Sequence, residues 1–119
     1  MDATGFANYL AVAARGRRSG SKFRPLVVKD AVSRCRRVES VLAVDLDDLL
    51  RRRKLHTVLV WIKTQRGQFA FHCDPARGIR ALVWAVGLYA KFVDHSRAVR
   101  RRRRVARAAR SQPACGERQ

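Results

Sequence analysis

The arginine run near the C-terminus is the strongest chemical signal in this sequence. Residues 97–110 read RAVRRRRRVARAAR and contain no acidic residue. Guanidinium groups bind phosphate oxygens through their charge and through paired N–H donors. We predict nucleic-acid contacts by Arg97, Arg100, Arg101, Arg102, Arg103, Arg104, Arg107 and Arg110. Together they would neutralise about six to eight phosphates, so affinity for duplex DNA should fall steeply as salt rises.

A second basic set lies in the first forty residues. The glycine-bracketed segment GRRSGSKFRP and the helix expected after it supply the further predicted contacts Arg17, Arg18, Lys22, Arg24, Lys29, Arg36 and Arg37. The alternatives are a solvated connector for the first segment and an ordinary amphipathic helix for the second. The scarcity of acids opposite these arginines favours nucleic-acid binding.

The basic charge extends beyond the C-terminal run. The chain of 119 residues has 27 Lys and Arg against 9 Asp and Glu, a net charge of +18. Nine bases and one acid follow residue 96, which leaves 18 bases against 8 acids, or +10, for the rest. Removing the run should therefore weaken binding to a polyanion without abolishing it.

No pattern of catalytic or metal-binding residues stands out. The soft metal ligands considered are His56, His72, His95, Cys35 and Cys73. None forms a zinc-type pair such as C-x-x-C, and GRRSGSK lacks the spacing of a phosphate-binding loop. We therefore expect a non-enzymatic protein with no metal and no cofactor.

Cysteine usage and hydropathy indicate the compartment. Three cysteines without paired spacing argue against a disulfide framework. The N-terminus lacks the features of a secretory signal, and no apolar run approaches the roughly 20 residues that span a bilayer. These features predict a soluble, cytoplasmic, nucleoid-associated protein without membrane contact.

Helical spacing predicts most of the elements that would position these residues. A first helix, capped by Asp2 or Thr4, should reach about Arg15, with Phe6, Leu10 and Ala13 on one face. A second should begin at Pro25 and bury Val28, Ala31, Val32, Cys35, Val38 and Leu42. A short third helix should follow Asp45, with acids first and bases last, and this order gives Asp45, Asp47 and Asp48 a structural role.

The stretch from residue 55 to residue 73 is ambiguous. Val58, Val60 and Ile62 alternate as in a β-strand, and Arg66-Gly67 would suit a hairpin turn. The alternative is a helix from Leu55 to Gln65, followed by a loop. We choose the helix, because a lone hairpin is marginal in an otherwise helical domain.

The final expected helix starts at Asp74 or Pro75 and runs through Val93. Its predicted apolar face is Ile79, Leu82, Val83, Val86, Ala90 and Val93. Trp84 and Tyr89 should lie at the edge of the core, and Gly78 and Gly87 should pack closely against a neighbouring helix. We expect a helical domain over residues 1–95 and a disordered or helical arginine-rich tail over residues 96–119.

Several of these spacings resemble a known family. The residues concerned are Phe6, Tyr9 and Leu10, then the stretch from Val28 to Glu39 that includes SRCRRVE, then Tyr89 and Phe92. Their order and spacing resemble the N-terminal core-binding domain of tyrosine recombinases, the phage-integrase family. The resemblance covers roughly Phe6 to Val93. It implies a bundle of four or five helices that forms half of a clamp around duplex DNA, with the aromatic residues in packing roles.

These inferences lead to three functional hypotheses. The recombinase catalytic domain has no counterpart here, so the favoured hypothesis is an all-α, non-enzymatic protein that binds duplex DNA with modest specificity. One alternative is a protein-interaction module, such as a phage or mobile-element accessory factor, whose basic surface binds an acidic partner. The other is an RNA-binding protein. The sequence leaves the oligomeric state open.

Overall fold

The computed structural model describes residues 1–13, 23–69, 71 and 74–111, and these residues form helices without any strand. The elements in chain order are α1 (Ala3–Val12), α2 (Pro25–Leu42), α3 (Leu46–Arg51), α4 (Leu55–Thr64), the 3-10 helix η1 (Arg66–Gln68) and α5 (Pro75–Ser111). The prediction of a small all-α bundle is confirmed. Within the ambiguous stretch, α4 is helical as predicted and the hairpin alternative is wrong.

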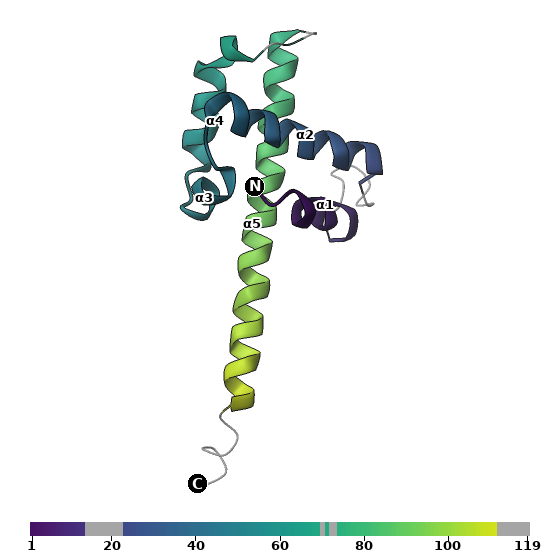
Figure 1. Cartoon of the computed structure of the whole chain (residues 1–119), viewed down its shortest axis with the longest axis vertical. Helices are drawn as coiled ribbons and strands as arrows, with labels where there is room; N and C mark the ends of the chain where they lie inside the picture. Colours follow the sequence, from purple (N-terminus) through teal and green to yellow (C-terminus); the bar gives the residue numbers. More distant parts are fainter. Residues whose placement is uncertain (14–22, 70, 72–73, 112–119) are drawn as a thin grey trace.

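The N-terminal half of α5 is the axis of the bundle. Figure 1 shows α2 crossing this half, with α3 and α4 on one side of α5 and α1 on the other. Apolar side chains from α1 to α5 meet in one core, because each of the first four helices packs its apolar face toward α5. The predicted α2 positions Val28, Ala31, Cys35 and Val38 are buried there, and Val32 and Leu42 are half-buried at its edge.

The inner face of α5 is wider than its apolar spacing predicts. Of the predicted face, Ile79, Leu82, Val86 and Val93 are buried, whereas Val83 and Ala90 are half-buried. The expectation that Tyr89 lies at the core edge is wrong, since it is fully buried. Its ring centroid lies 5.0 Å from that of Phe6 and 5.4 Å from that of Phe92. Trp84 does lie at the edge and is 38% exposed.

Helix α1 is short and is held by its apolar face. Asp2 caps it by accepting a hydrogen bond from the Gly5 N–H at 2.9 Å. Phe6 and Leu10 are buried, but Ala13 is exposed and follows the last helical residue, so its predicted place on the buried face is wrong. Arg15, the predicted end of this helix, lies outside the described residues.

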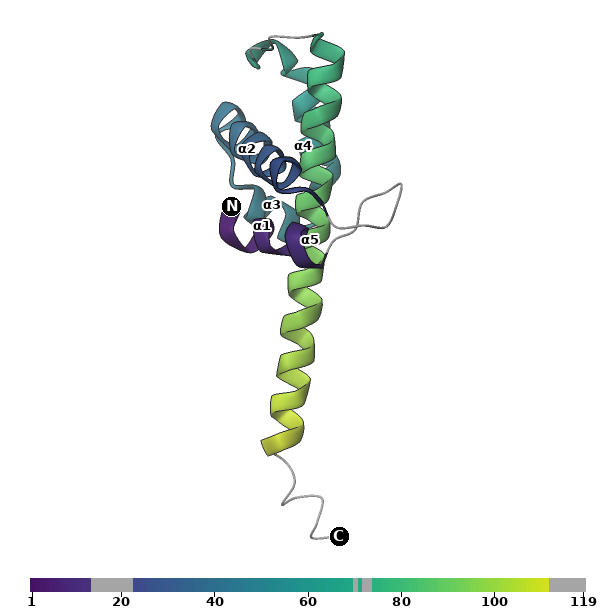
Figure 2. The ribbon, with the colours of Figure 1, turned by 90° about the vertical axis from the view of Figure 1, so that its right-hand side faces the viewer.

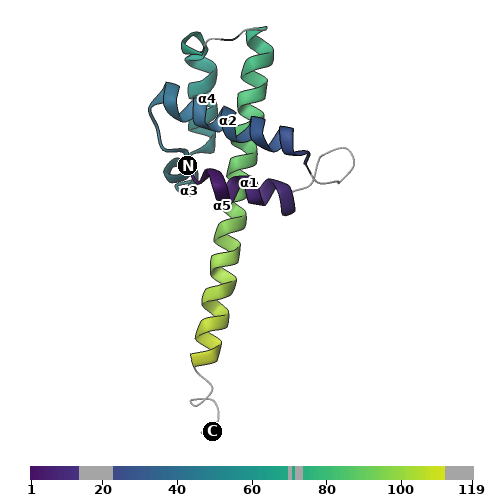
Figure 3. The ribbon, with the colours of Figure 1, turned by 45° about the vertical axis from the view of Figure 1, so that its right-hand side comes forward.

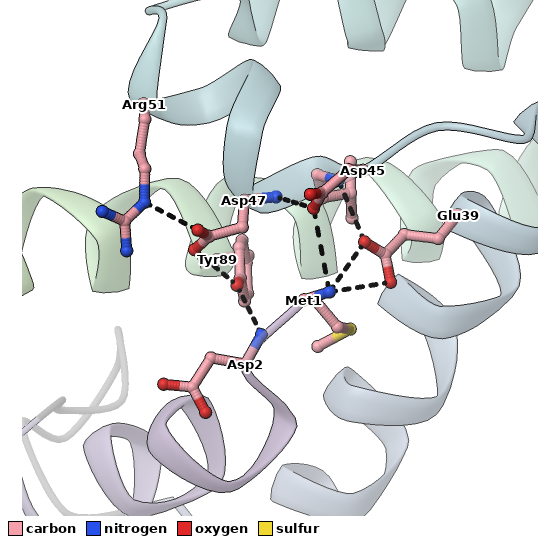
Figure 4. Close-up of polar contacts among 8 residues, drawn as sticks. Met1, Asp2, Glu39, Asp45, Asp47, Arg51 and Tyr89 are labelled. Atoms are coloured by element: carbon pink, nitrogen blue, oxygen red, sulfur yellow. Dashed lines mark hydrogen bonds and ion pairs between the residues drawn. The ribbon is translucent and has the colours of Figure 1, made fainter.

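A polar network ties the N-terminus to the bundle (Figure 4). The carboxylate of Glu39 accepts hydrogen bonds from the Met1 ammonium and from the Leu46 N–H, both at 3.0 Å. Burial lowers the pKa of that ammonium, but the hydrogen bond and charge of Glu39, helped by nearby aspartates, outweigh burial and raise it above its ordinary value. Glu39 thereby joins the end of α2 to the start of both α1 and α3.

The aspartates of α3 complete this network in structural roles, as predicted. Asp45 caps α3 by accepting from the Asp47 N–H. Asp47 pairs with Arg51 at 2.6 Å and accepts a hydrogen bond from the Tyr89 hydroxyl at 3.0 Å. Burial is the main reason that the pKa of Tyr89 is raised; the hydrogen bond from the Asp2 N–H lowers this pKa in part, and the hydrogen bond and charge of Asp47 raise it further. The phenol therefore remains a protonated donor.

The two glycines of α5 have different surroundings. A Cβ at Gly78 would overlap the ring of Phe71, which belongs to the segment before α5 and not to a helix. A Cβ at Gly87 would meet nothing within 4 Å. The predicted close packing against a helix is therefore wrong at Gly87, and at Gly78 the close neighbour is a loop side chain.

Helix α5 continues without a break from the bundle into the arginine run. It is helical from Pro75 to Ser111 and crosses the predicted boundary between residues 95 and 96. Figures 2 and 3 show its C-terminal half leaving the bundle as a straight extension. We call residues 97–110 the arginine arm. Of the two states expected for this segment, the structure contains the helical one.

Candidate nucleic-acid interface

The arginine arm is open to solvent along nearly its whole length. Every residue from 100 to 110 is exposed, and Arg97 is half-buried where the arm leaves the bundle. Arg100 through Arg104 take part in none of the ion pairs found between described residues. A helix of this length extends about 20 Å, and its diameter of about 10–12 Å matches the width of the major groove.

The arm has two unlike faces. At about 100° per residue, one sector of about 140° contains six of the eight arginines. They are Arg97, Arg100, Arg103, Arg104, Arg107 and Arg110. The opposite sector holds small apolar residues together with Arg101 and Arg102. We call the six-arginine sector the arginine face. It presents a compact row of phosphate donors along one side of a helix.

Like charges on this face oppose the helix that carries them. Arg100 lies three and four residues before Arg103 and Arg104, so these guanidinium groups are neighbours on the helix surface. Each such pair destabilises a helix by about 0.2–0.5 kcal/mol. Arginine and alanine, in contrast, have high intrinsic helix propensity. An anionic ligand that neutralises the face would therefore stabilise the arm.

The predicted contacts on α2 form a separate group. Lys29 and Arg36 are exposed and line an open groove between α1 and α2. Arg24 is exposed immediately before α2. Arg37 is half-buried, and its guanidinium lies 5.2 Å from the ring centroid of Phe71. These residues lie on the bundle and not on the arm, so α2 and the arginine face are two distinct surfaces. Arg17, Arg18 and Lys22 lie outside the described residues.

Sequence reasoning missed a basic ridge on the bundle half of α5. Four exposed residues lie on one side of the helix, because they follow one another at intervals of three, four and seven residues. They are Arg77, Arg80, Trp84 and Lys91. The Arg34 guanidinium lies 5.6 Å from the Trp84 ring centroid. The same 3.6-residue period, applied to charged rather than apolar residues, would have found this ridge.

Cys35, one of the metal ligands considered, is in the core. Its thiol is fully buried and donates a hydrogen bond to the carbonyl of Ala85 at 3.4 Å. Burial, with a smaller contribution from the Glu39 charge, raises the pKa of this thiol to about 12. The thiol is therefore protonated at neutral pH and unsuited to nucleophilic attack.

The described residues contain neither a metal-binding cluster nor a membrane-spanning helix. No group of three or more His, Cys, Asp or Glu side chains among them is arranged to hold a metal ion. His72 and Cys73, two of the ligands considered, lie outside the described residues. No helix in the described part of the chain is long and apolar enough to cross a membrane.

No protein-family model matches this chain, and no curated protein or solved structure is significantly similar to it. The resemblance to the recombinase core-binding domain therefore stays a prediction that rests on hydrophobic and aromatic spacing alone. A functional assignment has to come from the surfaces of this chain.

Proposed function

We propose that this chain is a non-enzymatic protein that binds duplex DNA through the arginine face of its α5 arm. The observation that carries the proposal is the combination of six arginines on one exposed side of a helix that is continuous with the bundle. Because α5 has no break between the bundle and the arm, the bundle sets the direction in which the arginine face points. Such a surface suits a long, regular polyanion.

The chemistry of the face favours phosphate contacts over base contacts. Arginines placed along one helix side reach the oxygens of successive phosphates, and such contacts position a protein without reading sequence. Asn and Gln, which read adenine through paired hydrogen bonds, are absent from the arm. Sequence specificity should therefore be modest, and affinity should depend strongly on ionic strength.

The basic ridge on α5 is a second cationic surface on the other side of the helix, because at about 100° per residue its mean direction differs from that of the arginine face by about 160°. Lys91 precedes the arm on the same helix, and Arg80 and Arg77 lie further back along the exposed side. A duplex held against the arginine face would therefore not meet these cations along the same side of α5. Since they belong to the bundle and not to the arm, they support the expectation that the bundle retains part of the affinity for a polyanion when the arm is neutralised.

Fluorescence anisotropy with a labelled duplex tests the proposal. We expect binding at about 50 mM salt and a loss of affinity of about a thousandfold by about 200 mM, because six neutralised phosphates give a slope near −5 in log K against log salt. Undetectable binding at the lower concentration would contradict the proposal. Competition with a structured RNA of equal length separates the RNA-binding alternative, which requires RNA to displace the duplex.

A further inference from the structure

The groove between α1 and α2 is a surface that the proposed function does not use. It is open, has a volume of about 740 Å³, and is lined along one wall by α1 and along the other by α2. Its floor is apolar, with Ala3 and Ala7 from α1 and Val28 and Val32 from α2. The exposed cations Lys29 and Arg36 lie on the α2 wall, and none of the described residues that line the groove is acidic.

The α1 wall allows a partner to approach closely. Ala3, Ala7 and Ala11 recur every four residues and therefore lie one above another on the side of α1 that lines the groove. Alanine methyl groups leave room for large side chains inserted from outside. Ala11 is exposed, and Ala3 and Ala7 are half-buried. The wall thus offers apolar surface that the described residues cover only in part.

The dimensions of the groove correspond to about two turns of helix. Ala3 and Ala11 are eight residues apart on α1, and Lys29 and Arg36 are seven residues apart on α2, which gives lengths of about 10–12 Å. An amphipathic helix in a groove makes its anchor contacts at i, i+3 or i+4, and i+7, over the same length. Two carboxylates about one heptad apart on such a helix would face Lys29 and Arg36.

We infer that this groove docks an acidic amphipathic helix of a partner protein. The apolar floor takes the partner's aliphatic anchors, and the cations of the α2 wall pair with its carboxylates. A second copy of this chain is a poor occupant, because its charge of +18 would be repelled by the same cations. A nucleic-acid duplex presents phosphates but no aliphatic anchors for the floor. This inference does not depend on DNA binding by the arm.

Two matched peptides test the inference with the full chain. The first, of about 18 residues, is an amphipathic helix former with leucine anchors at i, i+3 or i+4, and i+7, and with two glutamates about seven residues apart beside them. The second has lysines in place of the glutamates. We expect the acidic peptide to bind, and the double variant Lys29→Glu/Arg36→Glu to weaken its binding by about tenfold or more. The same variant should gain affinity for the lysine peptide.

A control variant and an arm variant make the result specific. Lys63 and Arg66 are also exposed and lie outside the groove, so Lys63→Glu/Arg66→Glu makes the same change in net charge and should leave peptide binding within about twofold. Replacing arginines of the arm by glutamine should also leave it unchanged. Failure of the acidic peptide to bind, or an equal loss in the control or in the arm variant, would overturn the inference.

Discussion

The buried hydroxyl of Tyr89 gives the sharpest test of the fold. It accepts a hydrogen bond from the Asp2 N–H at 2.9 Å and donates one to the Asp47 carboxylate at 3.0 Å. Tyr89→Phe removes both bonds and leaves the aromatic packing against Phe6 and Phe92 in place. A neutral hydrogen bond contributes about 0.5–1.5 kcal/mol and one to a charged group about 1.5–3 kcal/mol. Because both hydrogen bonds are only partly buried, we expect the free energy of unfolding to fall by about 2 kcal/mol, which is the sum of the two lower limits.

Urea unfolding followed by circular dichroism measures this loss. The transition midpoint of Tyr89→Phe should fall while the slope stays the same, because the surface exposed on unfolding does not change. Tyr9→Phe is the matched control, since the Tyr9 ring also packs against Phe92 but its hydroxyl makes no hydrogen bond with a described residue. The control should stay within about 0.5 kcal/mol of wild type. Equal effects of the two variants would refute the role assigned to the network.

Three further outcomes follow from the core and its polar edge. Glu39→Gln should destabilise the fold by about 1–3 kcal/mol in urea titrations. The stability of the wild type should decline above about pH 8, because the Met1 ammonium, whose pKa is raised in the folded state, then loses its proton. The Glu39→Gln variant should lose this pH dependence. Gly87→Ala should stabilise α5 by about 0.5–1 kcal/mol in thermal unfolding, whereas Gly78→Ala should not, because its Cβ overlaps a neighbouring ring. Cys35 should react with a thiol reagent only at the rate of unfolding, and rapid labelling of this residue in the native state would contradict its burial.

Local patterns were sufficient to predict most helices. The start of α2 follows from Pro25 at the first helical position, and the caps of α1 and α3 follow from Asp2 and Asp45. The choice of a helix at α4 needed its surroundings, because the alternation in Val58, Val60 and Ile62 also fits a strand. In this case the helical neighbours that bury Val58 and Ile62 decided the outcome.

Features made by distant residues could not be predicted. The partners of Tyr89 lie 87 and 42 residues away in the chain, so no local spacing reveals that its ring belongs in the core. The groove depends on how α1 packs against α2. The surroundings of Gly87 likewise depend on which side of α5 the other helices cover. The arginine face is different, because helical periodicity determines it once the arm is known to be a helix.

DNA binding by two neighbouring pairs of arginines tests the central claim most directly. Arg100→Gln/Arg103→Gln removes two charges from the arginine face, and Arg101→Gln/Arg102→Gln removes two from the opposite sector of the same turns. With a labelled duplex over about 50–200 mM salt, the first variant should reduce the slope of log K against log salt by about 2 and the second by less than 1. Equal reductions would contradict an interface formed by one face of a helical arm.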